Sequence, residues 1–343
     1  MSELKNADYK FRVGIIGAGL QGKRRASVFK EHSESKLVMV SSKNIEDAEN
    51  ISKDFNCEAS ARWQDIIERD DINTVLICTP PNLHPEMAIA ATNAGKHLLC
   101  EKPLANTLEE AQRMLESAKN NNVILKCGFN HRHHPAVFKA KELVNEGTIS
   151  EINFIRCVYG ICGRPGYEKE WRADSNIVGG GHLTEQGIHA IDLFRWFLGD
   201  FNRISGHIAT NFWQTASLED NAFVILETEK GQIASLHSSL TQWKNQFLFE
   251  IFGKNGYIII EGLGGAYGTE KLTVGKRNFY GPFKDETTEF RGADISWAKE
   301  WEEFTSAIKE KREPIGSGDD GFAALKIVST IYKIALKGKQ FQI

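Results

Sequence analysis

The stretch "VGIIGAGLQGKRRASVF", residues 13–29, decides how the first third of the chain folds. It joins an apolar run to a helical pattern through Gly17, Gly19 and Gly22, which have G-x-G-x-x-G spacing. Between a strand and a helix, the first glycine permits a tight turn, the second lets a pyrophosphate approach the backbone, and the third allows the helix to pack on the strand. The stretch therefore predicts a dinucleotide-binding turn with the phosphates at the N-terminus of the helix.

Short apolar runs alternate with helical patterns from residue 11 to residue 127. The runs indicate buried parallel strands. Such alternation implies right-handed crossovers and a parallel sheet with helices on both faces. The runs are FRVGIIG (11–17), LVMVS (37–41), TVLICT (74–79), HLLC (97–100) and VILKCG (123–128), and the helical stretches are 21–31, 45–55, 82–94 and 107–121.

The pattern changes near residue 150. Strand-like runs follow one another through hairpin-type turns such as EKGQ at 229–232, and they predict one large, mostly antiparallel sheet. A helix at 181–198 is expected to lie on this sheet, and helical patterns near 295–311 and 319–337 close the chain. The strand-like runs are 151–160, 203–213, 221–242, 246–262 and 271–276.

Together the two patterns predict an α/β fold with two domains, as suits a chain of 343 residues. The N-terminal Rossmann dinucleotide-binding domain covers residues 1–128. Residues 129–343 form an α/β domain for substrate binding and oligomerisation, with a large open, mostly antiparallel sheet. Its last helix is able to pack back toward the N-terminal domain.

The bulk composition indicates an ordinary globular protein. The chain is 41% hydrophobic and 25% charged with a formal net charge of −3, and its Lys and Arg residues are scattered, which argues against a nucleic-acid-binding protein. The polar start "MSELKNADYKF" does not resemble a signal peptide, and no apolar run approaches the ~18 residues of a membrane span. Six cysteines without a C-x-x-C pair are expected to be free thiols. We therefore expect a soluble, cytoplasmic protein.

The residues after the second predicted strand bear on which dinucleotide binds. An NAD-dependent enzyme usually offers Asp or Glu to the ribose 2′-hydroxyl about 20 residues after the glycines. Here Ser42 and Lys43 stand at the end of the strand, and the first acid is Glu46. A hydroxyl next to a cation suits a 2′-phosphate, so NADP(H) is favoured over NAD(H). The alternative is that Lys43 is an ordinary solvated surface lysine.

A second polar cluster lies in "GGGHLTEQGIHAIDLFRW", residues 179–196. Helical spacing puts Glu185, His189 and Asp192 on one face of an otherwise apolar helix, which is either a hydrogen-bonded core cluster or an active site. Hydride transfer from an alcohol needs a base for the hydroxyl proton, and an imidazole with a pKa near ~6.5 can accept and return it. His189 is therefore the candidate base, Glu185 its orienting carboxylate and Asp192 a structural residue.

Four motifs occur in a fixed order along the chain: GIIGAGLQG (14–22), CTPPNLH (78–84), CEKPLANTLEEAQ (100–112) and the glycine–histidine helix described above. In these motifs and their order the chain resembles the glucose–fructose oxidoreductase / inositol dehydrogenase / MocA family over nearly its full length. The resemblance implies a Rossmann domain followed by an open-sheet α/β domain. It also implies oxidation or reduction of a carbinol on a sugar, cyclitol or sugar nucleotide, and homodimers or homotetramers formed through the open sheet.

The resemblance assigns roles at matching positions. The lysine of the E-K-P tripeptide corresponds to Lys102, and the helix imidazole corresponds to His189. Glu185 stands where the family most often has Asp, so this chain keeps the charge and adds a methylene. From its chemistry, the Lys102 ammonium at the end of a parallel strand would stabilise a developing alkoxide or polarise a ketone.

Other residues are candidates for the cofactor and the substrate. The two prolines of the TPPNLH loop would form a stiff wall against the nicotinamide ring. The aromatic-plus-arginine loop at 163–174 suits a sugar ring with an anionic tail, with a packing loop as an equal alternative. The H-x-H-H sequence at 131–134 lacks a partnering acid, so we expect no metal site. The cofactor candidates are Gly17, Gly19, Leu20, Gln21, Gly22, Ser42, Lys43, Thr79, Pro80, Asn82, His84, Glu101 and Lys102, and the substrate candidates are Lys102, Asn130, Arg132, Tyr167, Trp171, Arg172 and His189.

Three functions compete on this pattern. The first is an NAD(P)-dependent dehydrogenase or reductase acting on a sugar, cyclitol or sugar nucleotide. The second is a glycosidase that uses tightly bound NAD for transient oxidation, a branch of the same family, and the third is a non-catalytic nucleotide-sensing module. A sensor would be expected to lose Lys102 or His189, and both are present. We therefore expect the first function, with a small sugar-type substrate and with neither nucleic acid nor a membrane as partner.

Overall fold

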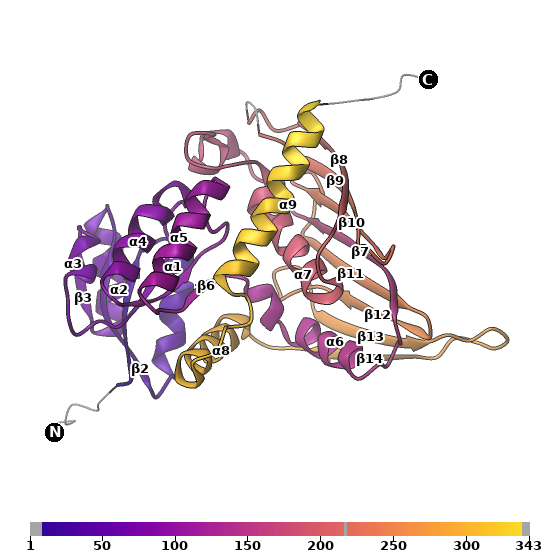
Figure 1. The fold of residues 1–343 in the computed structure, drawn as a ribbon, viewed down its shortest axis with the longest axis horizontal. Coiled ribbons are helices and arrows are strands. Elements are labelled where there is room, and N and C mark those ends of the chain that lie inside the picture. The colour runs from indigo at the N-terminus through magenta and orange to yellow at the C-terminus, as the bar shows by residue number, and fades with distance from the viewer. Residues whose placement is uncertain (1–8, 216–217, 338–343) are drawn as a thin grey trace. The chain divides into compact units, whose positions relative to one another are not determined.

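The chain folds into two compact units in the computed structural model, which describes residues 9–215 and 218–337. Figure 1 shows a helix-covered sheet in the first unit and a larger sheet in the second. No helix of the described residues is both long and apolar enough to cross a membrane. The first unit consists of residues up to 105, 109–128 and 297–319, and the second of residues 106–108, 129–296 and those from 320 onward.

A six-stranded parallel sheet forms the centre of the first unit, in the order β3-β2-β1-β4-β5-β6. Its central strands carry fully buried apolar side chains such as Val13, Ile15 and Val75, which is why they form continuous apolar runs in the sequence. The five predicted strands are present, and the predicted α/β class with a Rossmann sheet is confirmed. The strands are β1 (Phe11–Ile16), β2 (Ser35–Ser41), β3 (Glu58–Ser60), β4 (Thr74–Ile77), β5 (His97–Cys100) and β6 (Leu125–Cys127), and the helices are α1 (Leu20–Ser27), α2 (Ile45–Phe55), α3 (Gln64–Ile67), α4 (His84–Asn93) and α5 (Leu108–Asn120).

Helix α8 (Ser296–Glu310) packs in the core of the first unit although it lies far along the chain. Trp301 is 1% exposed, lies edge-on to Phe29 with 4.9 Å between ring centroids, and donates a hydrogen bond from Nε1 to Ser35 Oγ at 3.0 Å. This division differs from the sequence-based boundary, which assigned all of residues 129–343 to the second domain and let only the last helix pack back. The difference arises because an amphipathic pattern does not tell which sheet a helix covers.

An eight-stranded sheet forms the second unit, in the order β14-β13-β12-β11-β7-β10-β9-β8. All neighbours are antiparallel except β7 and β10, so the predicted large, mostly antiparallel sheet is confirmed. The strands are β7 (Ile152–Gly160), β8 (Arg203–Ala209), β9 (Asn221–Glu227), β10 (Ile233–Ser239), β11 (Gln246–Gly253), β12 (Gly256–Glu261), β13 (Glu270–Lys276) and β14 (Asp285–Phe290), and the helices are α6 (Pro135–Asn145), α7 (Ile188–Leu198) and α9 (Gly318–Lys337).

Helices cover one face of this second sheet, and none of the described helices covers the other (Figure 1). Phe194 of α7 stacks on Phe249 of β11 with 5.6 Å between ring centroids, which fixes the helix on the covered face. The opposite face exposes Phe223, Ile225 and Ile233, at 49%, 52% and 44% of their surfaces. These exposed apolar side chains lie on the neighbouring strands β9 and β10.

Candidate active site

The glycine turn between β1 and α1 has the geometry that the sequence predicts. Gly17 has a φ of +103°, and a Cβ there would lie 2.7 Å from the backbone of Cys78. A Cβ at Gly22 would lie 2.0 Å from the Gly17 carbonyl oxygen, so only glycine lets the helix pack this closely. Gly19 is the N-cap residue of α1, and no atom lies within 4 Å of a Cβ built there. The turn is therefore tightly packed on the sheet side and open at the helix N-terminus.

This open turn fits a dinucleotide. An anion at a helix N-terminus gains hydrogen bonds from free backbone N–H groups and is stabilised by the helix dipole. The first turn of α1 has no acidic residue that would repel a phosphate. Beside it, Leu20 is 60% exposed, and the buried Oε1 atom of Gln21 has no hydrogen-bond partner within the described structure. An unsatisfied buried oxygen is costly, and because phosphate oxygens only accept hydrogen bonds, the missing donor would be a hydroxyl of the bound cofactor.

Ser41 ends β2, and Ser42 and Lys43 follow it, at the position where a dinucleotide's ribose would be recognised. Ser41 is 1% exposed, and its Oγ has no hydrogen-bond partner among the described residues. Ser42 is half-buried and donates its backbone N–H to the Ser60 carbonyl at 3.0 Å, and Lys43 is exposed. Sequence reasoning missed Ser41, although the pair of serines at the strand end was a usable signal.

The TPPNLH loop after β4 is braced by His84. Its Nδ1 lies 3.0 Å from the Pro103 carbonyl oxygen and its Nε2 lies 2.9 Å from the Thr79 carbonyl oxygen. These two contacts join the loops that follow β4 and β5. Complete burial of the ring lowers the pKa of His84. Pro80 is half-buried and Asn82 is exposed, so this loop presents both a stiff and a polar surface.

Glu101 and Lys102 follow β5, and Glu101 belongs to a buried ion network. Arg25 of α1 donates from Nε to Glu101 Oε1 at 2.9 Å and from Nη1 to Glu300 Oε2, in α8, at 2.5 Å. All three side chains are at most 7% exposed. Burial alone would lower the pKa of Arg25, but the two carboxylates outweigh burial and raise it, so the guanidinium stays charged. The network anchors the residue directly before Lys102, whose peptide bond to Pro103 is cis.

In the second unit, the glycines at 179–181 are required because neighbouring atoms leave no room for side chains. A Cβ at Gly180 would lie 2.3 Å from Tyr332 Oη, and one at Gly181 would lie 2.2 Å from the Glu219 carbonyl oxygen. The buried Glu219 carboxylate accepts hydrogen bonds from two backbone N–H groups of this segment, at 3.0 and 2.8 Å. These contacts fix where the following helical segment begins.

The helix predicted at 181–198 is a regular α-helix only in its second part. Leu183–Gly187 form a π-helical turn, and α7 begins at Ile188. A π-turn has one more residue per hydrogen-bonded ring than an α-helix, so the prediction that Glu185 and His189 share one α-helical face does not apply across this junction. Single π-turns of this kind occur frequently at functional sites.

His189 lies in the first turn of α7 and is 3% exposed. Its ring stacks on the ring of His131, with centroids 3.8 Å apart and planes at 17°. Phe129 meets His189 edge-on, with 5.9 Å between ring centroids. The candidate base is thus enclosed by rings that limit its contact with water. Sequence reasoning did not identify His131 as its neighbour, because the two residues lie far apart in the chain.

Glu185 is bound by two residues of the loop that the sequence analysis singled out. Its carboxylate accepts hydrogen bonds from Tyr167 Oη at 2.9 Å and from Arg172 Nε at 2.8 Å. Burial, followed by the nearby Glu185 charge, raises the pKa of Tyr167, so the phenol remains a donor. Trp171, 38% exposed, carries the Arg172 guanidinium 4.4 Å from its ring centroid. The structure thus brings Glu185, Tyr167, Trp171 and Arg172 together.

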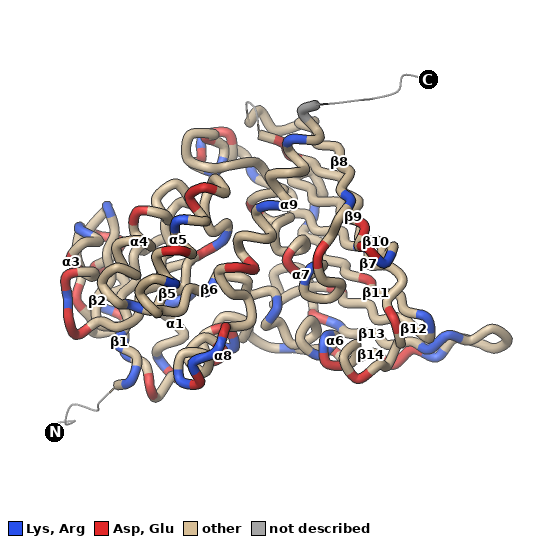
Figure 2. Tube along the Cα trace, viewed as in Figure 1, with Lys and Arg blue, Asp and Glu red and all other residues tan. Residues whose placement is uncertain are grey.

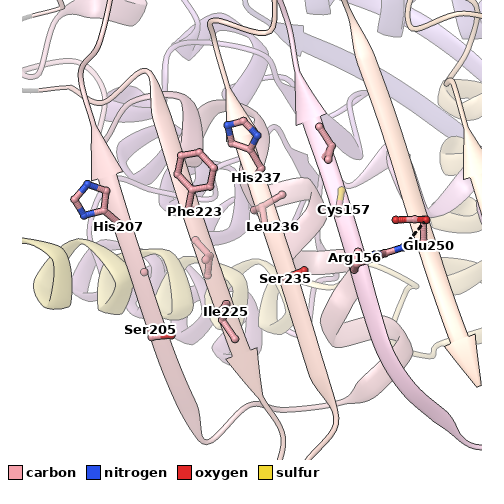
Figure 3. A pocket seen from close by; sticks show the side chains of 13 residues that line it. Arg156, Cys157, Ser205, His207, Phe223, Ile225, Ser235, Leu236, His237 and Glu250 are labelled. Carbon is pink, nitrogen blue, oxygen red and sulfur yellow. Dashed lines mark hydrogen bonds and ion pairs between the residues drawn. The ribbon is translucent and has the colours of Figure 1, made fainter.

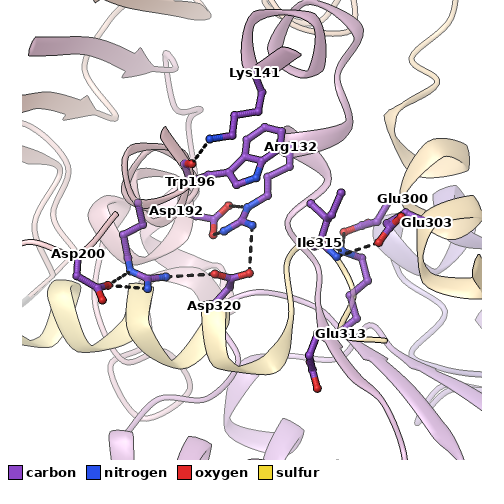
Figure 4. A network of polar contacts seen from close by, with 12 residues as sticks. Arg132, Lys141, Asp192, Trp196, Asp200, Glu300, Glu303, Glu313, Ile315 and Asp320 are labelled. Carbon is purple, nitrogen blue, oxygen red and sulfur yellow. Dashed lines mark hydrogen bonds and ion pairs between the residues drawn. The ribbon is translucent and has the colours of Figure 1, made fainter. Parts of the chain in front are cut away.

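Arg132 belongs to an ion network with Asp192 of α7 and Asp320 of α9 (Figure 4). It donates from Nε and Nη2 to both carboxylate oxygens of Asp192, at 2.8 and 2.6 Å, and from Nη1 to Asp320 at 3.1 Å. Burial raises the pKa of Asp192 and the Arg132 charge opposes that shift. Asn130 is 4% exposed and donates from Nδ2 to Ser296 Oγ at 3.0 Å. The side chains of Asn130 and Arg132 are therefore bound to other protein groups, and these contacts hold the short helix η3 (Asn130–His133) in place.

Charged residues of both signs occur in both units. Lys and Arg residues alternate with Asp and Glu residues along both units (Figure 2). Within residues 9–215 and 218–337, no group of three or more His, Cys, Asp or Glu side chains could hold a metal ion.

Comparisons with known proteins relate two long segments of the chain to one oxidoreductase family. Residues 11–129 match the model of an oxidoreductase family with an NAD-binding Rossmann fold, and residues 137–259 match the GFO/IDH/MocA C-terminal domain. The chain is 35% identical over 209 residues to levoglucosan dehydrogenase of Pseudarthrobacter phenanthrenivorans, which is 58% of this chain and 54% of that protein. It is 27% identical over 345 residues to inositol 2-dehydrogenase of Rhizobium meliloti, covering 97% of this chain and 99% of the relative.

The solved structures lead to the same family. A levoglucosan dehydrogenase in complex with NADH and levoglucosan superposes with a TM-score of 0.87 and 27% identity, over 95% of this chain and 97% of that one. The two family models together match more than half of the chain. The chain therefore belongs to the Gfo/Idh/MocA family of oxidoreductases, with an NAD-binding Rossmann fold in its first unit.

Proposed function

We propose that this protein transfers a hydride between a nicotinamide cofactor and a carbinol or ketone of a sugar or cyclitol. The observation that carries the proposal is the enclosed imidazole of His189 in the first turn of α7. A carbinol can give up a hydride only if its hydroxyl proton also leaves, and an imidazole accepts a proton near neutral pH. The solved relative that holds both NADH and levoglucosan supports the same substrate class.

The chain's own residues have distinct roles in this reaction. His189 takes the hydroxyl proton during oxidation and returns it during reduction. The Lys102 ammonium stabilises negative charge that develops on the reacting oxygen. Glu185 orients the site through its bonds to Tyr167 and Arg172. When bound, the nicotinamide supplies the hydride acceptor or donor.

The substrate's ring is proposed to contact the Tyr167–Arg172 loop. The exposed part of Trp171 offers an aromatic face to a sugar ring, and Arg172 offers N–H donors to its hydroxyl groups. Asn130 and Arg132 are proposed to support the substrate site indirectly, because their side chains are already bound to Ser296 and to Asp192.

The cofactor is proposed to lie along the carboxyl ends of the first unit's strands, as in other open α/β sheets. The glycine turn receives the pyrophosphate, and the end of β2 receives the ribose. The TPPNLH loop and the segment after β5 flank the nicotinamide. The proposed cofactor residues are Gly17, Gly19, Leu20, Gln21 and Gly22 at the phosphates, Ser42 and Lys43 at the ribose, and Thr79, Pro80, Asn82, His84, Glu101 and Lys102 toward the nicotinamide.

Direct assay with a panel of polyols tests this function. Purified protein is incubated with NAD⁺ or NADP⁺ and with levoglucosan or myo-inositol, and formation of reduced nicotinamide is followed. Turnover with at least one polyol is expected. Cleavage of a glycoside by protein that retains its cofactor, without net reduction of added nicotinamide, would instead indicate a glycosidase. Cofactor binding without either reaction would indicate a sensor.

We further propose that the enzyme prefers NADP(H), and we expect NADPH to bind more tightly than NADH by roughly tenfold, the value of one charged hydrogen bond. Lys43 and the hydroxyls that end β2 suit a 2′-phosphate, and β2 ends without a carboxylate. Ser42→Asp should reverse the preference, and Lys43→Ala should abolish it. Both dissociation constants are measured by fluorescence titration.

Lys53→Ala provides the matched control, because Lys53 is an exposed lysine at the end of α2. It should leave both dissociation constants unchanged. Equal affinity of the unmodified protein for the two cofactors would show that Lys43 is only a surface lysine.

We also propose a homodimer or homotetramer formed through the open face of the second sheet. This face has a hollow of ≈ 670 Å³ lined by residues of β7 to β11 (Figure 3). Phe223 and His237 stack there with 4.1 Å between ring centroids, and Ile225 adds exposed apolar surface. A broad apolar face with a few polar groups is the composition of a subunit interface.

Light scattering at micromolar concentration should give at least twice the mass of one chain. Ile225→Glu should reduce the mass to that of a monomer, because a charge buried in the interface is costly. Tyr280→Ser is the matched control, since Tyr280 is 99% exposed in the β13–β14 connection and does not line the hollow. A monomeric mass for the unmodified protein would refute this assembly.

A cytoplasmic location is proposed on a separate observation. All six cysteines are free thiols in the structure, and free thiols persist in a reducing compartment.

A further inference from the structure

A second imidazole lies face to face with the proposed base. The rings of His131 and His189 are 3.8 Å apart at their centroids and nearly parallel, at 17°. Both residues are almost fully buried, with 7% and 3% of their surfaces exposed. Two imidazoles this close in a poorly solvated position cannot easily carry a positive charge at the same time, because like charges repel strongly where water is excluded. Their protonation states must therefore be coupled.

The hydrogen bonds of His131 favour its protonated form. Its Nδ1 lies 3.2 Å from Asn130 Oδ1, and its Nε2 lies 2.8 Å from Tyr159 Oη. Asn130 donates from its Nδ2 to Ser296 Oγ, which leaves the amide oxygen turned toward the imidazole. An amide oxygen only accepts hydrogen bonds, so Nδ1 of His131 must carry a proton.

The other ring nitrogen faces a phenol that has a second acceptor for its single proton. Tyr159 Oη donates to Gln186 Oε1 at 2.8 Å. Burial raises the pKa of Tyr159 well above its ordinary value, so the phenol remains protonated and has one hydrogen to give. If that hydrogen goes to Gln186, the bond between Tyr159 and His131 requires a proton on the imidazole Nε2. In that arrangement both ring nitrogens of His131 donate, and the imidazole is a cation.

Other titratable groups around the pair also favour a positive charge on His131. His134 meets its ring edge-on at 5.5 Å, and His134 Nδ1 in turn lies 3.0 Å from Glu270 and 4.0 Å from Asp294. Around Tyr159, the Tyr267 hydroxyl and the Glu185 carboxylate complete the surroundings. The negative charge of these carboxylates favours a cation, and burial of the His131 ring opposes it. Glu270 is bound to His134, and Glu185 is bound to Arg172.

We propose that His131 is a positioning residue that binds the first proton of the pair and thereby keeps His189 neutral. The substrate's hydroxyl proton would then be the second and less favourable proton of the pair, so His131 lowers the basicity of His189 and the pH below which His189 is already protonated. The catalytic consequence rests on the proposed function, whereas the coupling between the two imidazoles does not.

Titration of the histidine ring signals by NMR tests the coupling without any assay of activity. The midpoint of His189 is measured in the unmodified protein and in His131→Phe, which keeps a stacked ring but removes the charge. The signals are assigned by their loss in His189→Gln and His131→Phe. The His189 midpoint should rise by at least about half a pH unit in His131→Phe, because the neighbouring cation has gone. A smaller rise, or a fall, overturns the proposal.

Tyr159→Phe keeps the proposal testable if His131→Phe does not fold. It removes the hydroxyl that accepts the Nε2 proton of His131, so the midpoint of His131 should fall by at least about half a unit. An unchanged or higher midpoint overturns the proposal. His32→Gln, in the first unit, is the control and should leave the midpoints of both paired histidines unchanged.

The activity profile then separates this inference from the proposed function. For oxidation, the acidic limb of kcat/KM against pH should move to higher pH in His131→Phe, in parallel with the His189 midpoint. Ring signals that shift in a protein without turnover would refute the proposed function and leave the coupling established. Turnover with an unmoved His189 midpoint would refute the coupling and leave the proposed function standing.

Discussion

Replacing His189 by alanine should lower kcat by about 10²–10⁴-fold and leave the cofactor dissociation constant within about twofold of its original value. The proton of the reacting hydroxyl loses its acceptor, and no other group is expected to take it at a comparable rate. The cofactor is unaffected because its proposed residues lie in the first unit and His189 lies in the second. Steady-state kinetics and cofactor titration on the same preparation measure both quantities.

The controls for this prediction separate chemistry from folding. Glu185→Gln should be much milder, because the side chain keeps its size and loses only its charge. Thermal unfolding of each variant is recorded beside its kinetics, since His189 is buried and stacked on His131. If activity fell only in proportion to the folded fraction, His189 would be a core residue and not the base.

Lys102→Met should lower kcat by a similar factor, about 10²–10³-fold, with cofactor affinity less affected. Methionine keeps the unbranched apolar stem and removes only the ammonium, so the loss reports on charge stabilisation at the reacting oxygen. The effect should be large because fixed charges act strongly in a site that excludes water. Turnover and single-turnover rates of hydride transfer are the measurements.

Lys119→Met is the comparison for that variant. Lys119 is an exposed lysine in the last turn of α5, also in the first unit, and its replacement should change neither kcat nor KM. Equal kcat values for Lys102→Met and Lys119→Met would remove Lys102 from the chemistry.

Strands with apolar runs could be predicted from the sequence, including the edge strands β6 and β8, whereas the two polar edge strands could not. β1 and β4 are buried on both faces and appear as unbroken apolar runs. β3 and β14 lie at sheet edges and have the polar sequences EAS and DETTEF, which bury too little surface to create a pattern. Helix α8 was located correctly in the chain but could not be assigned to a sheet, because its partners Phe11 and Phe29 lie almost 300 residues earlier.

In the candidate site, features that depend on neighbouring residues in the sequence could be predicted, and contacts between distant residues could not. The glycine turn was predictable because its geometry depends on a few consecutive residues. The partners of Glu185 were not, since Tyr167 and Arg172 reach it from a loop without regular spacing. The π-turn at Leu183–Gly187 was also missed, because its sequence is compatible with an ordinary α-helix. The stacking of His131 on His189 depends on the tertiary fold and left no mark in the sequence.

The discontinuous first unit has a consequence for how this enzyme can be rearranged, by evolution or by design. Because residues 297–319 complete it, the cofactor-binding half is not a cassette that can be cut out after residue 128. A fragment ending there would lack Trp301 and Phe304, both almost fully buried, and would expose the apolar surface that they cover. Exchange of the segment between residues 128 and 297 among relatives therefore requires two junctions, one at each end of that segment. Helix α8 is then inherited together with the sheet that it covers.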